Sequence, residues 1–316
     1  MERYDPQFMD LACRDVITRA VAQEIAEGRG CGEKGDHVLL SLEHLSSTLI
    51  YEKLPHVVET TRNFKGIDPT ITPIPVAPTA HYTMGGIPTN INGEVLMPTD
   101  EGMIPVRGLF ALGEAACSSV HGANRLGCNS LLDLMVFGKR VPHYALNTTD
   151  SSLLPNKNKS LAEQAISQLD RLRLQKGPMS LSHTRQSLMT SMQHYVGVYR
   201  HRQGLQHNLT FLNELAESGK SWHIGDSSLM WNTQLLEALE LENMLLLSLS
   251  TTSSALRRQE SRGAHYRSDF PQRDDNQWRV HSLISVSASH EFHYKTTPVR
   301  TTCMDPLTPT FTPPVA

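Results

Sequence analysis

The most informative feature of this chain is an arginine in a loop flanked by glycines. Arg125 lies in the segment His121–Asp133, which reads HGANRLGCNSLLD and closely follows Gly113-Glu114. The arginine side chain presents a planar fork of N–H donors that matches a carboxylate or a phosphate in two parallel bonds. The residue types and their spacing therefore predict an anion site at this loop.

An apolar helix is expected to begin directly after this loop, near Asn129 or Ser130. Ser130 and Asp133 stand at the spacing of a capping box, which favours a helix start there. The first N–H groups of a helix lack acceptors within it, and the positive end of the helix dipole attracts negative charge. A redox cofactor and a carboxylate substrate can share such a corner.

Three motifs of the chain resemble one known family. They are SVHGANRLGCNSLLDL around Arg125, TAHYTMGGIPT at residues 79–89, and MERYDP with DLACRDV near the N-terminus. Together they look like the flavoprotein subunit of succinate dehydrogenase, and the related fumarate reductase shares them. The similarity runs from Met1 to about Asp275. It implies the C-terminal portion of such a subunit, without the N-terminal half that holds the dinucleotide fold and the flavin-bonding histidine.

The resemblance assigns substrate chemistry to three residues. His81 and Arg125 match family residues that bind the dicarboxylate, and Arg14 matches the arginine that takes the substrate proton. An arginine normally stays charged, so the interpretation is a proton relay in which Arg14 passes a proton along neighbouring acids. Spacing alone favours other roles. A lone histidine is usually structural, and Arg14 lies at the edge of an apolar helical stripe, as a snorkelling arginine does.

The resemblance also implies FAD as the cofactor. Glu114 matches a flavin-contacting glutamate and suits a ribose hydroxyl. Ser130 and Leu131 match the helix-start pair beside the isoalloxazine ring, where N–H groups stabilise negative charge on the reduced flavin. Cys128 stands where the family usually has a smaller residue, and we expect it to crowd the flavin edge.

The complete enzyme that this chain resembles oxidises succinate to fumarate by hydride transfer to FAD and passes electrons to an iron–sulfur subunit and quinone. The implied partners are that subunit and membrane-anchor subunits, with membrane contact only through them. The implied location is peripheral, on the cytoplasmic or mitochondrial matrix side of the inner membrane. Two alternatives stay open. One is a catalytically inactive fragment, because Met1 coincides with an internal family motif, and the other is fumarate reductase running the reverse reaction.

A third candidate family is represented by aspartate oxidase, which shares the arginine loop. The run ESRGAH at residues 260–265 favours the dehydrogenase.

A second glycine motif, GCGEKG at residues 30–35, matches the G-x-G-x-x-G fingerprint of dinucleotide folds. That fingerprint has meaning only after a strand and before a helix. Here a helical pattern precedes it and the strand-like residues 36–42 follow it, so we interpret it as an ordinary helix-to-strand loop.

Composition narrows the class further. The chain has 316 residues, a formal net charge of −3, 39% hydrophobic residues and no long basic block, so no nucleic-acid partner is expected. Its five cysteines form no C-x-x-C pair and no H-E-x-x-H motif occurs, so no metal site is expected. No apolar run approaches the about 18 residues of a membrane-spanning helix, and the N-terminus lacks the apolar stretch of a secretory signal.

The expected fold class is α/β plus all-α. A stretch with four prolines, residues 69–78, places a boundary near residue 73. With the resemblance, the expected domains are the remainder of a capping (substrate) domain (1–73), the C-terminal part of the FAD-binding domain (74–147), an antiparallel helical bundle (148–262) and a small C-terminal tail domain (263–316). The expected elements are strands at 93–97, 109–112, 280–286 and 291–294, and helices at 7–27, 162–174, 183–199, 205–218 and 233–255.

Overall fold

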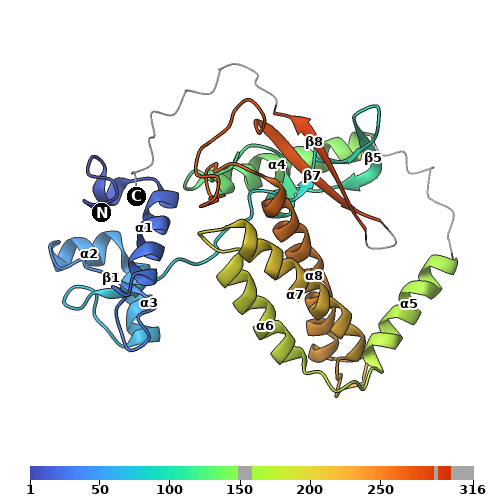
Figure 1. Ribbon diagram of the computed structural model, residues 1–316, viewed down its shortest axis with the longest axis horizontal. Coiled ribbons are helices and arrows are strands. Elements are labelled where there is room, and N and C mark those ends of the chain that lie inside the picture. The colour runs from blue at the N-terminus through green and yellow to red at the C-terminus, as the bar shows by residue number, and fades with distance from the viewer. Residues whose placement is uncertain (149–158, 288–290, 300–316) are drawn as a thin grey trace. The chain divides into compact units, whose positions relative to one another are not determined.

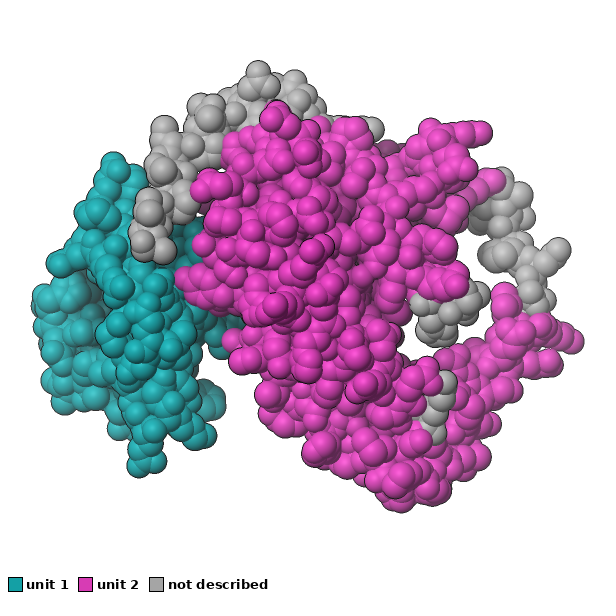
Figure 2. Space-filling view, in the orientation of Figure 1, with its two compact units in different colours: residues 1–81, 310–316 teal, residues 82–309 magenta. Residues whose placement is uncertain are grey.

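The computed structural model describes residues 1–148, 159–287 and 291–299 (Figure 1). These residues form two compact units (Figure 2). Met1–His81 belong to unit 1, and unit 2 begins at Tyr82. The division follows the proline-rich stretch 69–78, near the boundary expected at residue 73. Each unit is described by itself below.

Unit 1 starts with a helix that is shorter than the sequence pattern suggested. A 3-10 turn, η1 (Met9–Leu11), precedes helix α1 (Arg14–Ala26). Ala12 and Cys13 lie between them in extended conformation, with ψ angles of 158° and 145°. The single helix expected over about 7–27 was therefore wrong at its start, because these two residues leave the helical region of backbone space. Ala12 is nevertheless buried with the inner face of α1.

The glycine motif at residues 30–35 connects α1 to strand β1 (Val38–Leu40), as expected. A Cβ atom placed at Gly30 would lie 2.0 Å from the backbone oxygen of Gly35. The first glycine of the motif is therefore needed for a close approach of the backbone to itself within this loop. Strand β1 pairs antiparallel with β2 (Ile74–Val76).

Two helices of unit 1, α2 (Ser47–Lys53) and α3 (Pro55–Lys65), were not predicted. Their end signals are nonetheless present. The Ser46 hydroxyl accepts a hydrogen bond from the Leu49 N–H at 3.3 Å and caps α2. A proline opens α3, and Gly66 closes it with a φ of +67°. Helix α2 has only seven residues, too few for an apolar periodicity to show, whereas α3 is amphipathic and was missed despite its pattern.

Unit 2 begins with two small strand pairs. Strand β3 (Ile87–Pro88) pairs parallel with β6 (Ala116–Cys117), and β4 (Glu94–Pro98) pairs antiparallel with β5 (Met103–Phe110). The strand expected at 93–97 is confirmed as β4. Of the strand expected at 109–112, only residues 109–110 belong to a strand, the longer β5. Its first half was missed because a proline and a glycine interrupt the pattern.

Helix α4 (Asn129–Thr148) follows these strands and begins where the sequence predicted. Asn, Thr, Asp, Ser, Pro and Lys dominate residues 146–160, a composition that predicts a linker or exposed loop. The C-terminal end of α4 runs into this segment, most of which lies outside the described residues. The 3-10 turn η2 (Gly113–Ala115) connects β5 to β6. The arginine loop thus lies between β6 and α4.

The four helices that the sequence predicted after residue 161 come next in the chain. They are α5 (Lys159–Arg173), α6 (Leu181–Tyr195), α7 (Arg202–Ser218) and α8 (Thr233–Arg257), with the 3-10 turn η3 (Gly219–Ser221) after α7. Helices α6, α7 and α8 lie side by side and alternate in direction (Figure 1). Their shared faces bury the largest apolar cluster of the described chain, which includes Leu188, Leu212, Trp222 and Leu241.

A hairpin of β7 (Val280–Val286) and β8 (Phe292–Pro298) follows the bundle. The first strand matches the expected bounds, and the second is longer than the expected run at 291–294. The prolines of residues 308–316 predict an irregular end of the chain, and this segment lies outside the described residues.

A buried arginine closes the C-terminal end of α8. The side chain of Arg267 is fully buried, and its Nη1 donates hydrogen bonds to the backbone oxygens of Ala255, Leu256 and Arg258 at 2.8, 3.0 and 3.0 Å. Its Nε and Nη2 bind the two carboxylate oxygens of Asp269 at 2.8 and 2.7 Å. The last carbonyls of a helix lack intrahelical donors and carry negative partial charge. The Arg267 guanidinium therefore donates to the free carbonyls of this helix end, and Asp269 balances its charge.

The imidazole of His265 lies in the same region. Its Nδ1 is 2.8 Å from Nη1 of Arg200, and its Nε2 is buried without a hydrogen-bond partner among the described residues. Burial, followed by the charge of Arg200, lowers the pKa of His265 to about 3. The folded protein therefore holds this histidine neutral.

We predict that Arg267→Ala lowers the free energy of unfolding by about 3–5 kcal/mol, because it leaves Asp269 and three helix-end carbonyls without their donor. Urea denaturation measures this value. The matched control is Arg185→Ala, whose guanidinium faces Glu240 at 3.5 Å on the surface of the bundle. The control is expected to cost less than about 1 kcal/mol, and equal losses would contradict the account.

We predict that His265 makes the protein acid-sensitive. Its folded pKa of about 3 lies below the ordinary value of 6.5, so the unfolded chain binds the proton first as pH falls. Stability is then lost between about pH 6.5 and 3, by up to about 1.4 kcal/mol per pH unit. His265→Gln keeps an acceptor for Arg200 and removes this contribution. Urea denaturation of both proteins from pH 7 to pH 4 should give converging stabilities, and parallel curves would refute the assignment.

Candidate functional site

The arginine loop holds its cation with uncharged groups. Nη1 of Arg125 donates to the Ser130 hydroxyl at 2.7 Å, and the guanidinium carbon lies 5.1 Å from the centre of the Tyr82 ring. The Nε and Nη2 edge has no acceptor among the described residues, and no carboxylate there forms an ion pair with Arg125. A half-buried guanidinium with a free edge is suited to a bidentate bond with an incoming carboxylate.

A buried histidine and aspartate stand behind this arginine. The Tyr82 hydroxyl lies 3.3 Å from Nε2 of His121, and the same nitrogen lies 3.5 Å from Oδ2 of Asp133. The side chains of His121 and Asp133 are only 6% and 3% exposed. Burial, and next the negative charges of Asp133 and Glu114, raise the pKa of Tyr82. Tyr82 therefore stays a neutral phenol and offers its ring face to the cation.

Ser130 and Asp133 do not form the capping box that was expected at the start of α4. The second carboxylate oxygen of Asp133 lies 3.4 Å from the Ser118 hydroxyl, so this residue faces inward and not toward the helix end. The capping-box prediction was wrong, because Asp133 is buried against His121 and Ser118 and the Ser130 hydroxyl accepts from Arg125.

The two helix-start N–H groups assigned to the flavin are not equivalent. The Leu131 N–H donates to the backbone oxygen of Cys128 at 3.0 Å. The Ser130 N–H has no acceptor among the described residues. Only Ser130 therefore offers a helix-start N–H to an anion, whereas Leu131 offers an apolar side chain that is 60% exposed.

Glu114 lies in η2 and is exposed to solvent. Its Oε1 accepts a hydrogen bond from the Thr83 N–H at 2.9 Å. A Cβ atom at Gly86 would lie 2.6 Å from the backbone oxygen of Ala115, and the φ of Gly86 is +136°. The segment that follows Tyr82 is therefore fixed against η2, beside the arginine loop, by a contact that only glycine permits.

The other two predicted site residues belong to unit 1. Arg14 is the first residue of α1 and is exposed, and His81 is exposed and is the last described residue of the unit, directly before Tyr82. The neighbouring acid Asp15 binds Arg19 at 2.8 Å on the same helix. Within unit 2 the structure brings Arg125 together with Ser130. The roles assigned to all six residues stay predictions.

Sequence reasoning missed Tyr82, His121 and Asp133 as supports of Arg125. One signal was available. Asp133 interrupts the apolar run Leu131–Val136, and an acid in a run that predicts burial needs a partner. That partner, His121, begins the same motif.

The first turns of α4 expose apolar side chains to solvent. Leu131, Leu132 and Met135 are 60%, 61% and 74% exposed, and Leu126 in the loop is 76% exposed. Clusters of this kind on a soluble surface usually mark a place where another molecule or domain packs.

Comparisons with known proteins identify the class. A family model described as an FAD binding domain matches residues 2–131, and a model described as fumarate reductase flavoprotein C-term matches residues 185–313. The chain is 45% identical over 291 residues to the succinate dehydrogenase flavoprotein subunit of Rickettsia bellii, covering 90% of this chain and 48% of that protein. It is 47% identical over 285 residues to the mitochondrial succinate dehydrogenase [ubiquinone] flavoprotein subunit of Oryza sativa subsp. japonica, covering 90% and 45%.

Its fold matches a solved structure of the quinol fumarate reductase of E. coli with a TM-score of 0.87 and 34% identity, over 95% of this chain and 50% of that one. The matched regions define a flavoprotein with part of an FAD-binding domain and a C-terminal flavoprotein domain. The chain belongs to the succinate dehydrogenase and fumarate reductase flavoprotein family. It spans about half the length of the relatives that it matches.

We predict that Cys128→Gly relaxes the arginine loop. Cys128 has a φ of +65°, a left-handed conformation that costs a residue with a side chain about 1–2 kcal/mol. Glycine removes this strain but gains freedom in the unfolded chain, so Cys128→Gly is expected to be about 0.5–1 kcal/mol more stable than Cys128→Ala. Both variants lose the exposed thiol, so only the backbone differs. Thermal unfolding compares them, and a more stable alanine variant would contradict the prediction.

Proposed function

We propose that this chain is the C-terminal portion of the flavoprotein subunit of succinate dehydrogenase. The proposed reaction oxidises succinate to fumarate by hydride transfer to FAD and passes electrons to an iron–sulfur subunit and quinone. The observation that carries the proposal is Arg125, a cation without an acidic partner among the described residues whose free edge fits a carboxylate. The 45% and 47% identities to relatives named succinate dehydrogenase support it.

In this proposal Arg125 binds one carboxylate of succinate through its Nε and Nη2 edge. The Ser130 hydroxyl and the Tyr82 ring hold the guanidinium plane in one direction, which lowers the entropy lost when the substrate binds. His81 hydrogen-bonds to a substrate carboxylate. Arg14 relays the substrate proton: the guanidinium gives one of its protons to a neighbouring acid other than Asp15, which Arg19 already binds, and the guanidine nitrogen takes up the proton that leaves succinate.

The residues at the start of α4 fit a flavin. The Ser130 N–H and the helix dipole suit negative charge, the Glu114 carboxylate suits a ribose hydroxyl, and the exposed Leu131 side chain suits an aromatic ring system. FAD, when bound, supplies the acceptor for the hydride. Ser130 would then stabilise the charge that develops at this helix end, and Leu131 would exclude water from it.

We propose an iron–sulfur subunit and membrane-anchor subunits as partners, on the cytoplasmic or mitochondrial matrix face of the inner membrane. The names of the relatives call them subunits, and that of Oryza sativa is mitochondrial. In the parts of the chain that the structure describes, no helix is long and apolar enough to cross a membrane. Contact with the membrane through partners is consistent with this finding.

Two alternatives have a specific observation behind them. A catalytically inactive fragment would explain both the half-length match and the exposed apolar residues on α4. Fumarate reductase running the reverse reaction is supported by the TM-score of 0.87 to the E. coli enzyme. The lower identity to that enzyme, 34% against 45–47%, favours the dehydrogenase.

The visible absorption spectrum tests the proposal. The chain is purified alone and after co-expression with a second chain that carries the half of the family fold that this chain does not cover. We expect flavin peaks near the usual ~450 nm that bleach when succinate is added under argon. A protein without flavin in both preparations supports the inactive fragment, and one that only fumarate reoxidises supports the reductase.

We predict that Arg125→Lys lowers the succinate-dependent rate and raises the malonate Kd by about 10–100-fold, because lysine cannot reproduce the bidentate bond. Malonate is a dicarboxylate with a single methylene, so it binds without being dehydrogenated. The control is Arg107→Lys on the exposed side of β5, which should change neither value. Equal behaviour of the two variants would remove Arg125 from the substrate site.

A further inference from the structure

The ESRGAH run at residues 260–265 contacts the arginine loop directly. The Ala264 N–H donates to the backbone oxygen of Ala123 at 3.0 Å. A Cβ atom at Gly263 would lie 2.4 Å from that same oxygen, and Gly263 has a φ of +55°. Ala123 stands two residues before Arg125. The contact therefore acts on the backbone that carries the carboxylate-binding side chain.

Gly263 and Ala264 form the tip of a closed turn. The Arg262 N–H donates to the His265 oxygen at 2.8 Å, and the His265 N–H donates to the Arg262 oxygen at 3.0 Å. Two reciprocal bonds around two central residues leave the tip little freedom. The turn is thus a rigid body that presents one N–H to the loop.

A buried carboxylate holds this turn in place. Glu260 is fully buried, and its two oxygens accept from Nε and Nη2 of Arg262 at 2.8 and 2.9 Å. The Asp274 N–H donates to the same carboxylate at 3.0 Å. Arg258 pairs with the same carboxylate, so two cations and a backbone N–H hold this buried charge and the arrangement resists displacement.

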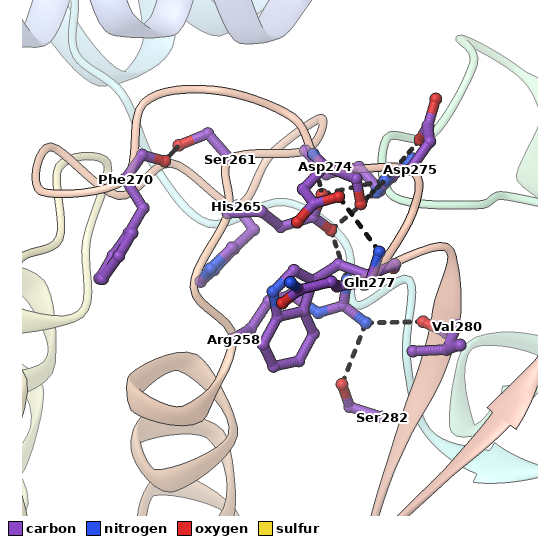
Figure 3. A network of polar contacts seen from close by, with 12 residues as sticks. Arg258, Ser261, His265, Phe270, Asp274, Asp275, Gln277, Val280 and Ser282 are labelled. Carbon is purple, nitrogen blue, oxygen red and sulfur yellow. Dashed lines mark hydrogen bonds and ion pairs between the residues drawn. The ribbon is translucent and has the colours of Figure 1, made fainter.

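Further bonds connect the turn to the bundle and to the hairpin. Figure 3 shows the Ser261 hydroxyl directed at the Phe270 oxygen, 2.8 Å away, and Arg258 reaching Ser282 of β7 at 3.0 Å. The Arg267 N–H donates to the Ser261 hydroxyl at 2.8 Å. These bonds therefore hold the turn against two regular elements, the C-terminal end of α8 and strand β7.

The supports within the arginine loop lie mainly at its two ends, where His121 faces Asp133 and the Asn129 side chain donates to the Val120 oxygen. Its backbone adopts positive φ at Gly122 and at Cys128, and Leu126 is exposed to solvent. A loop without buried apolar side chains opens easily unless other elements hold it. The turn holds the loop through its hydrogen bond to the Ala123 oxygen.

We propose that the turn Arg262–His265 is a positioning element that fixes Ala123 and thereby the direction of the Arg125 side chain toward its carboxylate ligand. The dicarboxylate part of this inference rests on the proposed function. The turn lies after α8, far along the chain from the loop that it orders.

Two pairs of variants test the proposal in the flavin-containing protein. Gly263→Ala and Gly263→Asn both place a Cβ against the Ala123 oxygen. Asparagine tolerates positive φ, so the second variant isolates the clash from backbone strain. The matched controls are Gly66→Ala and Gly66→Asn, because Gly66 has a φ of +67° and nothing within 4 Å of an added Cβ.

Hydrogen exchange and malonate binding are measured for each variant. We expect amides in residues 121–127 to exchange about tenfold faster in both Gly263 variants, with slower exchange preserved in the bundle. We expect the malonate Kd to rise about tenfold in the same variants, since a small misplacement of a binding group is costly. The Gly66 variants should match the wild type in both measurements.

Three results would overturn the inference. They are unchanged exchange at residues 121–127, faster exchange spread evenly over unit 2, and faster local exchange with an unchanged malonate Kd. A wild-type protein that fails to bind malonate would instead overturn the proposed function. The exchange comparison would then still decide whether the turn orders the loop.

Discussion

The proposed site depends on a cation that the fold must hold in place without pairing it with one of its own acids. Arg125 meets this constraint because its neighbours are a phenol ring and a hydroxyl, while the nearby acids have other partners. Asp133 faces His121, and Glu114 accepts from Thr83. A carboxylate bonded to Arg125 would have occupied the edge that an anionic ligand needs. The buried aspartate, which looked like a helix cap in sequence, is better understood as part of the support behind Tyr82.

The arginines of the C-terminal segment show the opposite arrangement. Arg262 and Arg267 each bind a carboxylate through two bonds, and Arg267 also satisfies the end of α8. Such pairs are rigid because two parallel bonds fix the plane of the guanidinium group. The molecule therefore separates two uses of one residue type. Paired guanidinium groups build a fixed frame, and Arg125, which has no acidic partner among the described residues, stays available beside the start of α4. The contact of Ala264 with Ala123 connects the two.

The sequence predicted those parts of the structure that depend on local signals. The start of α4, the bundle and β7 came from apolar periodicity, and the glycine motif at 30–35 was correctly separated from a dinucleotide fingerprint by its setting. What failed depended on contacts that spacing does not encode. The extended residues Ala12 and Cys13 divide the first helix. Asp133 faces inward because its carboxylate contacts His121. The contact of Gly263 with Ala123 joins segments far apart in the chain, so only the fold shows it.

A crystal structure of the flavin-containing protein with malonate tests the central claim most directly. The account predicts one malonate carboxylate on the Nε and Nη2 edge of Arg125, with the Ser130 hydroxyl still bound to Nη1 and the Tyr82 ring still beneath the guanidinium. Malonate bound elsewhere, with that edge of Arg125 turned to solvent or paired with an acid of the protein, would contradict it.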